Sequence, residues 1–286
     1  MLERLKYTVT MNRLNTAKRA QIIAVLIEGN SVRSTARLTG VAFNTVLKLL
    51  PEIGRACAAY QDRVFRNLPC KRIQCDEIWS FCYAKQANVP EQFQGTFGVG
   101  DVWTWVTMCA DTKLVPAWQV GPRDVQTANK FMQDLASRLA NRVQLTTDGH
   151  GVYLTAVERA FGSEIDYAML VKIYSTHPEN QEVRYSPAQC CGAKKEAIMG
   201  HPVRQHVSTS FVERQNLTMR MQIRRFTRLT NAFSKKLENH AAAVALHYMA
   251  YNFAKVHKTL RVTPAMEAGV ADHVWTMEEI ASLLNS

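Results

Sequence analysis

Several features of common protein classes are missing from this chain of 286 residues. No uninterrupted apolar run reaches the ~18 residues that a membrane-spanning helix needs. The start of the chain also lacks the apolar core of a signal peptide. Internal repeats and low-complexity tracts are missing as well. These absences argue against a membrane protein, a secreted protein and a repeat array, and they favour a location in the cytoplasm.

Cysteine is present, but it lacks the spacing of a paired site. The seven cysteines form no Cys-X-X-Cys pair, and an odd number in a long chain predicts reduced thiols in a cytosol. Cys190 and Cys191 are adjacent, and His177, His201 and His206 are near them in sequence, so these residues could bind zinc. Their spacing matches no standard zinc module, which favours the alternative of free thiols in a loop.

Acidic residues are scarce relative to basic ones, with 24 Asp and Glu against 35 Lys and Arg and a net charge of +11. The excess is concentrated in two stretches. Residues 1–60 hold nine basic and three acidic residues, and residues 208–236 hold seven basic residues and only Glu213. This distribution predicts a polyanionic partner. The alternative is two ordinary basic faces in contact with solvent.

The first 60 residues have the pattern of three helices, expected at 16–28, at 31–39 and from 44 toward 60. A break or kink is expected at Pro51. Ala36, Gly40 and Val46 have the spacing of a helix-turn-helix. This motif needs a small residue where the helices cross, a glycine in the turn and an apolar residue in the second helix.

The third predicted helix would present Asn44, Thr45 and Lys48 to a DNA major groove. A three-helix unit of this size could instead be a structural cap. The local excess of positive charge favours DNA binding.

The rest of the chain alternates between strand and helix patterns after a link at 61–70. The expected elements are strands at 72–81, 97–110 and 114–120, a helix at 125–140, a strand at 143–147, a helix at 152–161, a strand at 165–174, and helices at 209–225 and 239–253. The first three strands have short connections, which predicts an antiparallel meander.

This order predicts an α/β fold, namely a ribonuclease-H-like five-stranded mixed sheet with flanking helices, preceded by an all-α helix-turn-helix domain. We expect the helix-turn-helix domain at 1–60, the catalytic domain at 61–257 and a C-terminal helical tail at 258–286. Proline and glycine make 175–207 a loop-rich insertion in the catalytic domain. In the tail, Thr276 and Glu279 have the spacing of a capping box.

Three acidic residues lie in settings that suit metal binding. Asp76 falls in the first predicted strand, Asp148 closes the fourth, and Glu213 lies in a basic helix. Mg²⁺ prefers oxygen ligands, and two such ions can activate an attacking oxygen and stabilise a leaving one. Either aspartate alone could be an ordinary polar residue at a strand end. Their joint placement with Glu213 favours a metal site for phosphodiester chemistry.

Several motifs resemble DDE transposases of the insertion sequence 1 family. They are DEIW at 76–79, TTDGH at 146–150, ERQNLTMR at 213–220, RRFTRLTNAFSKK at 224–236, and YNF with HKTLRVTPAMEAG between 251 and 269. The resemblance covers nearly the whole chain. It implies a ribonuclease-H-like core that uses Mg²⁺ or Mn²⁺, as two ions, with Asp76, Asp148 and Glu213 as catalytic metal ligands. Members of the family often carry a cysteine zinc finger ahead of the helix-turn-helix, and none is visible here.

The resemblance implies cleavage of transposon ends and transfer of the 3′-hydroxyl strand to target DNA. It also implies a homo-oligomer on double-stranded DNA in the cytoplasm, associated with the nucleoid. Arg220 matches the basic residue that the family places seven positions after its glutamate, and Arg224 and Arg225 extend the predicted DNA contact. The alternatives are a catalytically silent helix-turn-helix regulator and a related nuclease or integrase.

Overall fold

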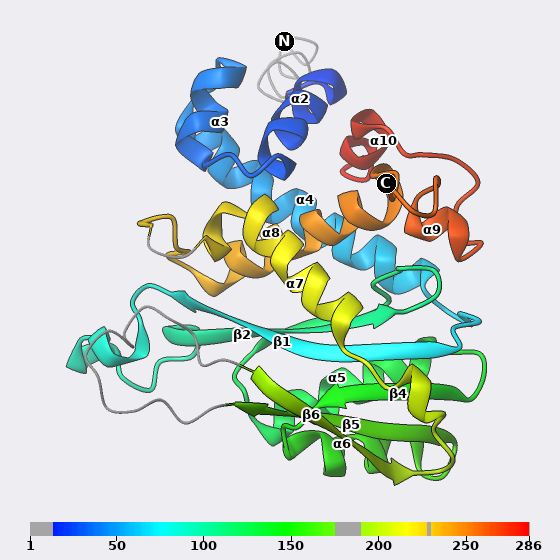
Figure 1. Cartoon of the computed structure of the whole chain (residues 1–286). Coiled ribbons are helices and arrows are strands. Elements are labelled where there is room, and N and C mark those ends of the chain that lie inside the picture. Colours follow the sequence, from blue (N-terminus) through cyan, green and yellow to red (C-terminus); the bar gives the residue numbers. More distant parts are fainter. Residues whose placement is uncertain (1–13, 175–189, 228–229, 286) are drawn as a thin grey trace, which may run out of the picture. The chain divides into compact units, whose positions relative to one another are not determined.

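The computed structural model describes residues 14–174, 190–227 and 230–285 (Figure 1). The chain forms two compact units. Unit 1 comprises Met1–Val64, Met219–Met266 and Ala271–Ser286, and unit 2 comprises Phe65–Thr218 and Glu267–Val270. This division differs from the predicted domains at 1–60, 61–257 and 258–286, because residues 219–257 belong to the compact unit of the N-terminal helices.

Unit 1 begins with three helices, α2 (Thr16–Ile27), α3 (Val32–Thr39) and α4 (Phe43–Val64). The Ser31 hydroxyl caps α3 by accepting a hydrogen bond from the backbone N–H of Ser34, the third residue of the helix. Gly40 ends α3 in the left-handed conformation, with φ of 66°, which a side chain would disfavour. Ala36 and Val46 lie in one buried cluster. The α4 helix continues through Pro51 without the predicted break.

The remainder of unit 1 is also helical. It contains η5 (Arg224–Phe226), α8 (Leu237–Met249), the π-helical η6 (Ala250–Ala254), α9 (Pro264–Glu267) and α10 (Met277–Ser282). The predicted capping box of Thr276 and Glu279 is confirmed at the start of α10. Helices α4 and α8 cross closely at Gly54, where an added Cβ would lie 2.5 Å from Ala242 Cα. Only glycine allows this approach of the two backbones.

Unit 2 contains a mixed sheet of six strands in the order β3-β2-β1-β4-β5-β6. The strands are β1 (Arg72–Cys82), β2 (Gly100–Cys109), β3 (Trp118–Gly121), β4 (Val143–Asp148), β5 (Ile165–Tyr174) and β6 (Cys190–Met199). Strands β1, β2 and β3 form the predicted antiparallel meander, and β4 pairs in parallel with both β1 and β5. The first and fourth strands of the chain are therefore neighbours in the sheet.

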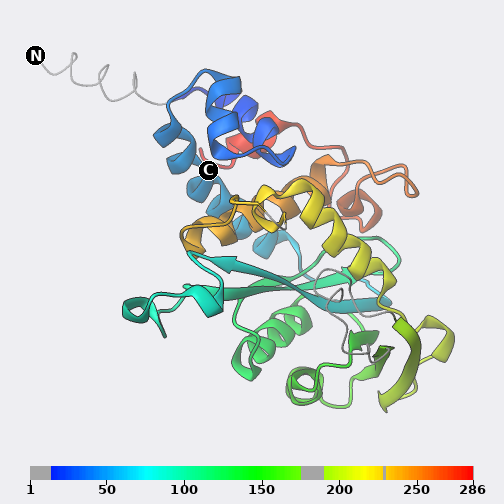
Figure 2. The same ribbon diagram turned by 60° about the vertical axis from the view of Figure 1, so that its left-hand side comes forward.

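Two helices, α5 (Val125–Arg138) and α6 (Val152–Phe161), lie side by side against the sheet (Figures 1 and 2). Their common contact with the sheet is Trp105 of β2, which is fully buried. Its ring lies 5.9 Å from that of Phe131 in α5 and 5.5 Å from that of Tyr153 in α6. The alternating apolar residues of the strands thus meet the apolar faces of both helices in one core.

The sixth strand corrects the sequence prediction in two ways. β6 lies inside the stretch 175–207 that we expected to be a loop-rich insertion, and it raises the number of strands from five to six. Residues 175–189 of that stretch lie outside the described residues. β6 is an edge strand whose residues are all exposed or partly exposed, so it carries no alternation of apolar and polar residues that the sequence could reveal.

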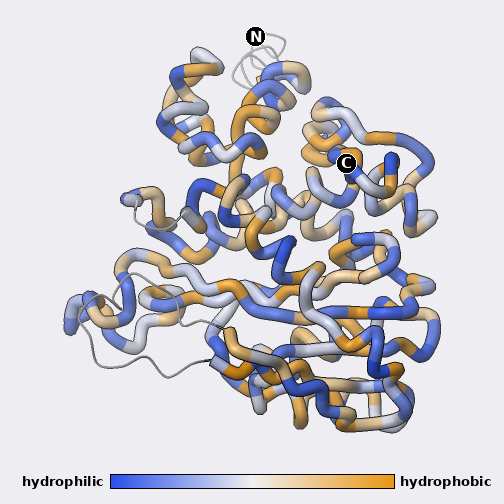
Figure 3. The backbone as a smooth tube through the Cα atoms, viewed as in Figure 1, coloured by the Kyte–Doolittle hydropathy of each residue, from blue (hydrophilic) through white to orange (hydrophobic). Residues whose placement is uncertain are grey.

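Among the described residues, no helix is both long enough and apolar enough to cross a membrane. Figure 3 shows polar residues interspersed with apolar ones along the helices of both units. The pattern is that of helices with one face in a protein core.

Candidate metal centre

The register of the sheet brings Asp76 and Asp148 together. β1 and β4 pair in parallel, with Arg72 opposite Gln144 and Gln74 opposite Thr146. Continuing this register by two residues sets Asp76 beside Asp148. The pairing ends before that point, so the two strands part where their carboxylates begin. Ligand sites in sheets of this kind commonly lie beyond the carboxyl ends of strands.

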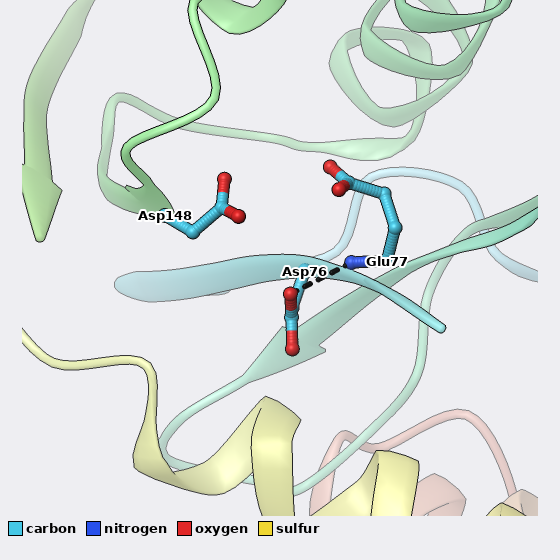
Figure 4. Close-up of side chains that lie close together, drawn as sticks. All are labelled: Asp76, Glu77 and Asp148. Carbon is cyan, nitrogen blue, oxygen red and sulfur yellow. Dashed lines mark hydrogen bonds between the residues drawn. The ribbon is translucent and has the colours of Figure 1, made fainter. Parts of the chain in front are cut away.

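A third carboxylate joins the two aspartates. Asp76, Glu77 and Asp148 each offer one oxygen, and these oxygens all lie within 4.8 Å of one another. Figure 4 shows Glu77 and Asp148 on one side of β1 and the Asp76 carboxylate directed to the other. Adjacent residues of a strand point to opposite faces, so the carboxylates of the cluster come from both faces of β1.

Our sequence analysis did not select Glu77. Its only signal in the sequence is its position directly after Asp76 in the DEIW motif. Alternation along a strand argues against two neighbouring residues sharing a site, so the sequence pattern does not predict that Glu77 joins Asp76.

Burial and the neighbouring negative charge raise the pKa values of two of these carboxyl groups, Asp76 and Glu77. Burial, followed by the charge of Asp148, raises the pKa of Asp76 to about 6. The same two causes raise the pKa of Glu77 to about 7. Both raised pKa values mean that the surroundings disfavour the charged carboxylates. A nearby cation would instead favour the charged forms. The cluster is therefore arranged to gain from a bound cation.

Arg123 supplies part of the missing positive charge. Its Nε donates a hydrogen bond to Glu77 Oε2 over 3.0 Å, and its Nη2 lies 3.7 Å from Asp148 Oδ2. The guanidinium also lies over the Trp103 ring, 4.7 Å from the ring centroid. Arg123 comes just before α5, where Asp124 caps the helix, so the start of that helix fixes its position.

The helix α7 (Ser210–Gln222) reaches the cluster from the other face of β1. Gln74 Oε1 accepts hydrogen bonds from the backbone N–H groups of Phe211 and Val212, over 2.9 and 3.1 Å, and so anchors the start of the helix. One turn further along, Asn216 Nδ2 donates to Asp76 Oδ2 over 2.8 Å. Gln74 and Asp76 lie on the same face of the strand, so both direct α7 toward the cluster.

Glu213 lies in the first turn of α7, but outside the closest set of oxygens. Its Oε1 lies 2.6 Å from Lys172 Nζ and accepts a hydrogen bond from the Thr209 hydroxyl. Its negative charge contributes to the raised pKa of Asp76, which places it within electrostatic reach. The structure thus brings Asp76, Asp148 and Glu77 together, with Glu213 next to them and paired with a lysine.

The carboxylate oxygens of the cluster are suitable ligands for a hard divalent cation. Carboxylate oxygens are the ligands that Mg²⁺ and Mn²⁺ prefer, whereas the sulfur and nitrogen ligands typical of zinc are missing from the cluster. Asn216 Oδ1 is buried and has no hydrogen-bond partner among the described residues. Unsatisfied buried oxygens are costly, and a cation or its water ligands would satisfy them.

The predicted DNA-binding residues all lie in unit 1. Asn44 and Lys48 of α4 are exposed, and Thr45 is partly exposed. Arg220 is partly buried near the end of α7, and Arg224 is exposed. Arg225 donates a hydrogen bond to the Ser234 hydroxyl over 3.0 Å.

Cys190 and Cys191 are exposed at the start of β6. Of the described residues, only the carboxylate cluster at Asp76 has the geometry of a group that could hold a metal, so these thiols show no zinc site.

The solved structures similar to this chain include transposase complexes. A piggyBac transposase synaptic complex with hairpin DNA matches with a TM-score of 0.44 and 11% identity, over 94% of this chain and 69% of that one. The Mos1 strand transfer complex matches with a TM-score of 0.23 and 15% identity, over 55% of this chain and 58% of that one. No protein-family model and no curated protein sequence matches the chain. Because these similarities are weak, the function proposed below rests on the site and the sequence motifs.

Proposed function

We propose that this protein is a metal-dependent DNA transposase, which cleaves transposon ends and joins the freed 3′-hydroxyl to target DNA. One observation carries the proposal: the parallel register of β1 and β4 sets Asp76 beside Asp148, and three carboxylate oxygens lie within 4.8 Å of one another. The strand order around β1, with β2 on one side and β4 and β5 on the other, supports a ribonuclease-H-like core. The motifs at 76–79, 146–150 and 213–220 support the insertion sequence 1 family.

In this proposal Asp76, Asp148 and Glu213 hold two Mg²⁺ or Mn²⁺ ions, and Glu77 adds a fourth carboxylate. Bound there, the ions would activate the attacking oxygen and neutralise charge on the phosphate. Asn216 holds the Asp76 carboxylate in position through its hydrogen bond. Lys172 contacts Glu213, and it would be able to contact a DNA phosphate if that carboxylate held a metal.

The helices of unit 1 supply DNA binding in this proposal. Asn44, Thr45 and Lys48 enter the major groove as part of a helix-turn-helix. The arginines at 220, 224 and 225 contact phosphates, which positions the strand without reading its sequence. Two transposon ends must be held at once, so the active form is a homo-oligomer on DNA.

The test is a cleavage and strand-transfer assay on labelled duplexes that carry the sequences flanking the coding region. Wild-type protein with Mg²⁺ is expected to nick these duplexes and to join them to a target plasmid. The variants Asp76→Asn and Asp148→Asn keep the size of the side chain but remove a charge, and each is expected to lose at least 1,000-fold in rate (about 4 kcal/mol). Glu158→Gln, an exposed acid on α6, is the matched control and should retain activity.

The assay separates the competing functions. Joined product identifies a transposase, hydrolysis without joining identifies a nuclease, and DNA binding without either identifies a regulator. Undiminished cleavage by Asp76→Asn would exclude the carboxylate cluster as the catalytic centre.

A further inference from the structure

A cavity of about 400 Å³ lies within unit 1. It is formed by the end of α2, the starts of α3 and α4, the segment that follows α7, and α8. Every residue that lines it belongs to unit 1. Its lining includes no residue of the metal centre and none of the α4 residues predicted to contact the major groove.

Apolar side chains make up most of the lining. Leu50, Ile223 and Leu246 are buried in the protein and contribute to the wall of the cavity. Two aromatic rings, Phe43 and Phe233, also line it, and the Phe43 side chain is 41% exposed. Such a surface suits a flat apolar group, which can stack on an aromatic ring.

The charged residues that line the cavity are all positive. Arg33, Arg224, Arg225 and Lys235 take part in the lining, and no aspartate or glutamate does. The Arg33 guanidinium lies 5.5 Å from the centroid of the Phe43 ring. The two basic stretches found in the sequence, at 1–60 and 208–236, therefore meet at this cavity. An occupant with an anionic group is favoured by charge complementarity.

Neutral polar groups complete the lining. The amide side chains of Asn30, Gln222, Asn231 and Asn239 can each donate and accept hydrogen bonds. His247 is buried, and burial followed by the charge of Lys255 lowers its pKa to about 3, so its imidazole is neutral. A heterocycle with both donors and acceptors on its edge matches this set better than a purely hydrocarbon group.

We propose that this cavity binds one unpaired nucleotide of a DNA strand. The base occupies the apolar interior and stacks on Phe43 or Phe233, and the phosphate contacts Arg33 and Arg224. Stacking on aromatic side chains and contacts to phosphate are the two common means of holding single-stranded DNA. The choice of DNA as the ligand rests on the proposed function, whereas the choice of an aromatic anion rests on the lining of the cavity alone.

The proposal is tested by binding in EDTA, so that cleavage plays no part. The probes are a fluorescently labelled duplex with one unpaired adenine, the same duplex with an abasic residue in that place, and a fully paired duplex. Wild-type protein is expected to bind the unpaired adenine about tenfold more tightly than the abasic probe. Ala243→Leu, which places a larger side chain in the cavity, is expected to abolish this preference.

Ala241→Leu is the matched control, because it lies on the same helix and does not line the cavity. It should keep the tenfold preference, and circular dichroism should show that both variants are folded. Equal binding of the adenine and abasic probes by wild-type protein would overturn the proposal. So would a preference that survives in Ala243→Leu.

A competition experiment distinguishes a nucleotide within a DNA strand from a free nucleotide. Deoxyadenosine monophosphate should not displace the DNA probe at about 1 mM, a concentration that would occupy a weak site for free nucleotides. Displacement would overturn the assignment to a DNA strand and assign the cavity to free nucleotides. Because no step uses the metal centre, failure here leaves the proposed cleavage activity untouched, and failure of cleavage leaves this binding untouched.

Discussion

The two units of this protein differ in charge as completely as they differ in fold. Unit 1 contains 19 Lys and Arg against 8 Asp and Glu, whereas unit 2 contains 16 of each. The whole net charge of +11 therefore belongs to the helical unit, and the unit with the sheet is neutral. The neutral unit nevertheless gathers three carboxylates within 4.8 Å.

This difference in charge distribution suits two kinds of charged ligand. A polyanion is attracted by many positive charges spread over a surface, and its attraction is weakened by salt. A divalent cation instead needs a few negative charges held close together in a buried place. Each unit has the arrangement that suits one of these ligands. Changes in one unit should therefore affect one kind of binding and spare the other.

After the losses expected from Asp76→Asn and Asp148→Asn, the next largest effect is expected from Glu213→Gln. If Glu213 becomes a metal ligand once its contact with Lys172 is broken, this variant should lose at least 100-fold in Mg²⁺-dependent cleavage, or about 3 kcal/mol. Its affinity for DNA, measured by fluorescence anisotropy, should stay within twofold of wild type. Glu77→Gln is the informative comparison, because Glu77 already lies in the cluster. A larger loss in Glu77→Gln than in Glu213→Gln would make Glu77 the third ligand.

The next effect concerns the packing of unit 1. Gly54→Ala adds a Cβ that would lie 2.5 Å from both Cα and Cβ of Ala242, so α4 and α8 must move apart. Overpacking of this kind costs about 1–3 kcal/mol of unfolding free energy. Thermal denaturation should show the loss, and DNA affinity should fall with it. Gly151→Ala, where an added Cβ meets no atom within 4 Å, is the control.

How far the sequence predicted the structure depended on burial. Strand β5 and helix α6 were predicted with the bounds that they have. β5 is a nearly continuous apolar run of strand length, and the apolar residues of α6 recur at the spacing of a helix. β6 was missed because an exposed edge strand leaves no such pattern. In the site, Asp76 and Asp148 were selected because one lies in a predicted strand and the other follows directly after one. The sequence did not predict that Glu77, Arg123 and Lys172 lie at the site. Their positions there depend on the register of the sheet and on contacts between distant segments, which a local sequence pattern does not reveal.

The pKa shifts in unit 2 predict an unusual dependence of stability on pH. Asp76 and Glu77 have pKa values raised to about 6 and about 7 in the folded chain. Folding therefore favours their protonated forms, so this contribution to stability is full below about pH 4 and is lost as the pH rises through 6 to 7. Each pKa lies a little more than two units above its usual value, which corresponds to a loss on the order of 3 kcal/mol for each group.

Thermal denaturation in EDTA between pH 5 and pH 8 measures this contribution. Asp76→Asn should flatten the decline with pH, and Mg²⁺ at pH 8 should restore stability to the wild type by neutralising the cluster. A decline that is unchanged in Asp76→Asn would show that other groups cause it.

The smallest effect is expected from single phosphate contacts in unit 1. Arg224→Ala should weaken DNA binding by about five- to tenfold at low salt, on every sequence alike, because a phosphate contact carries no sequence information. The slope of log affinity against log salt should decrease by about 1, since one fewer counterion is released. Lys258→Ala is the control, because Lys258 is an exposed residue of unit 1 outside both basic stretches. If both variants lower affinity equally, the binding reflects the total charge of unit 1. A loss confined to Arg224→Ala would instead locate the DNA path along the stretch from 208 to 236.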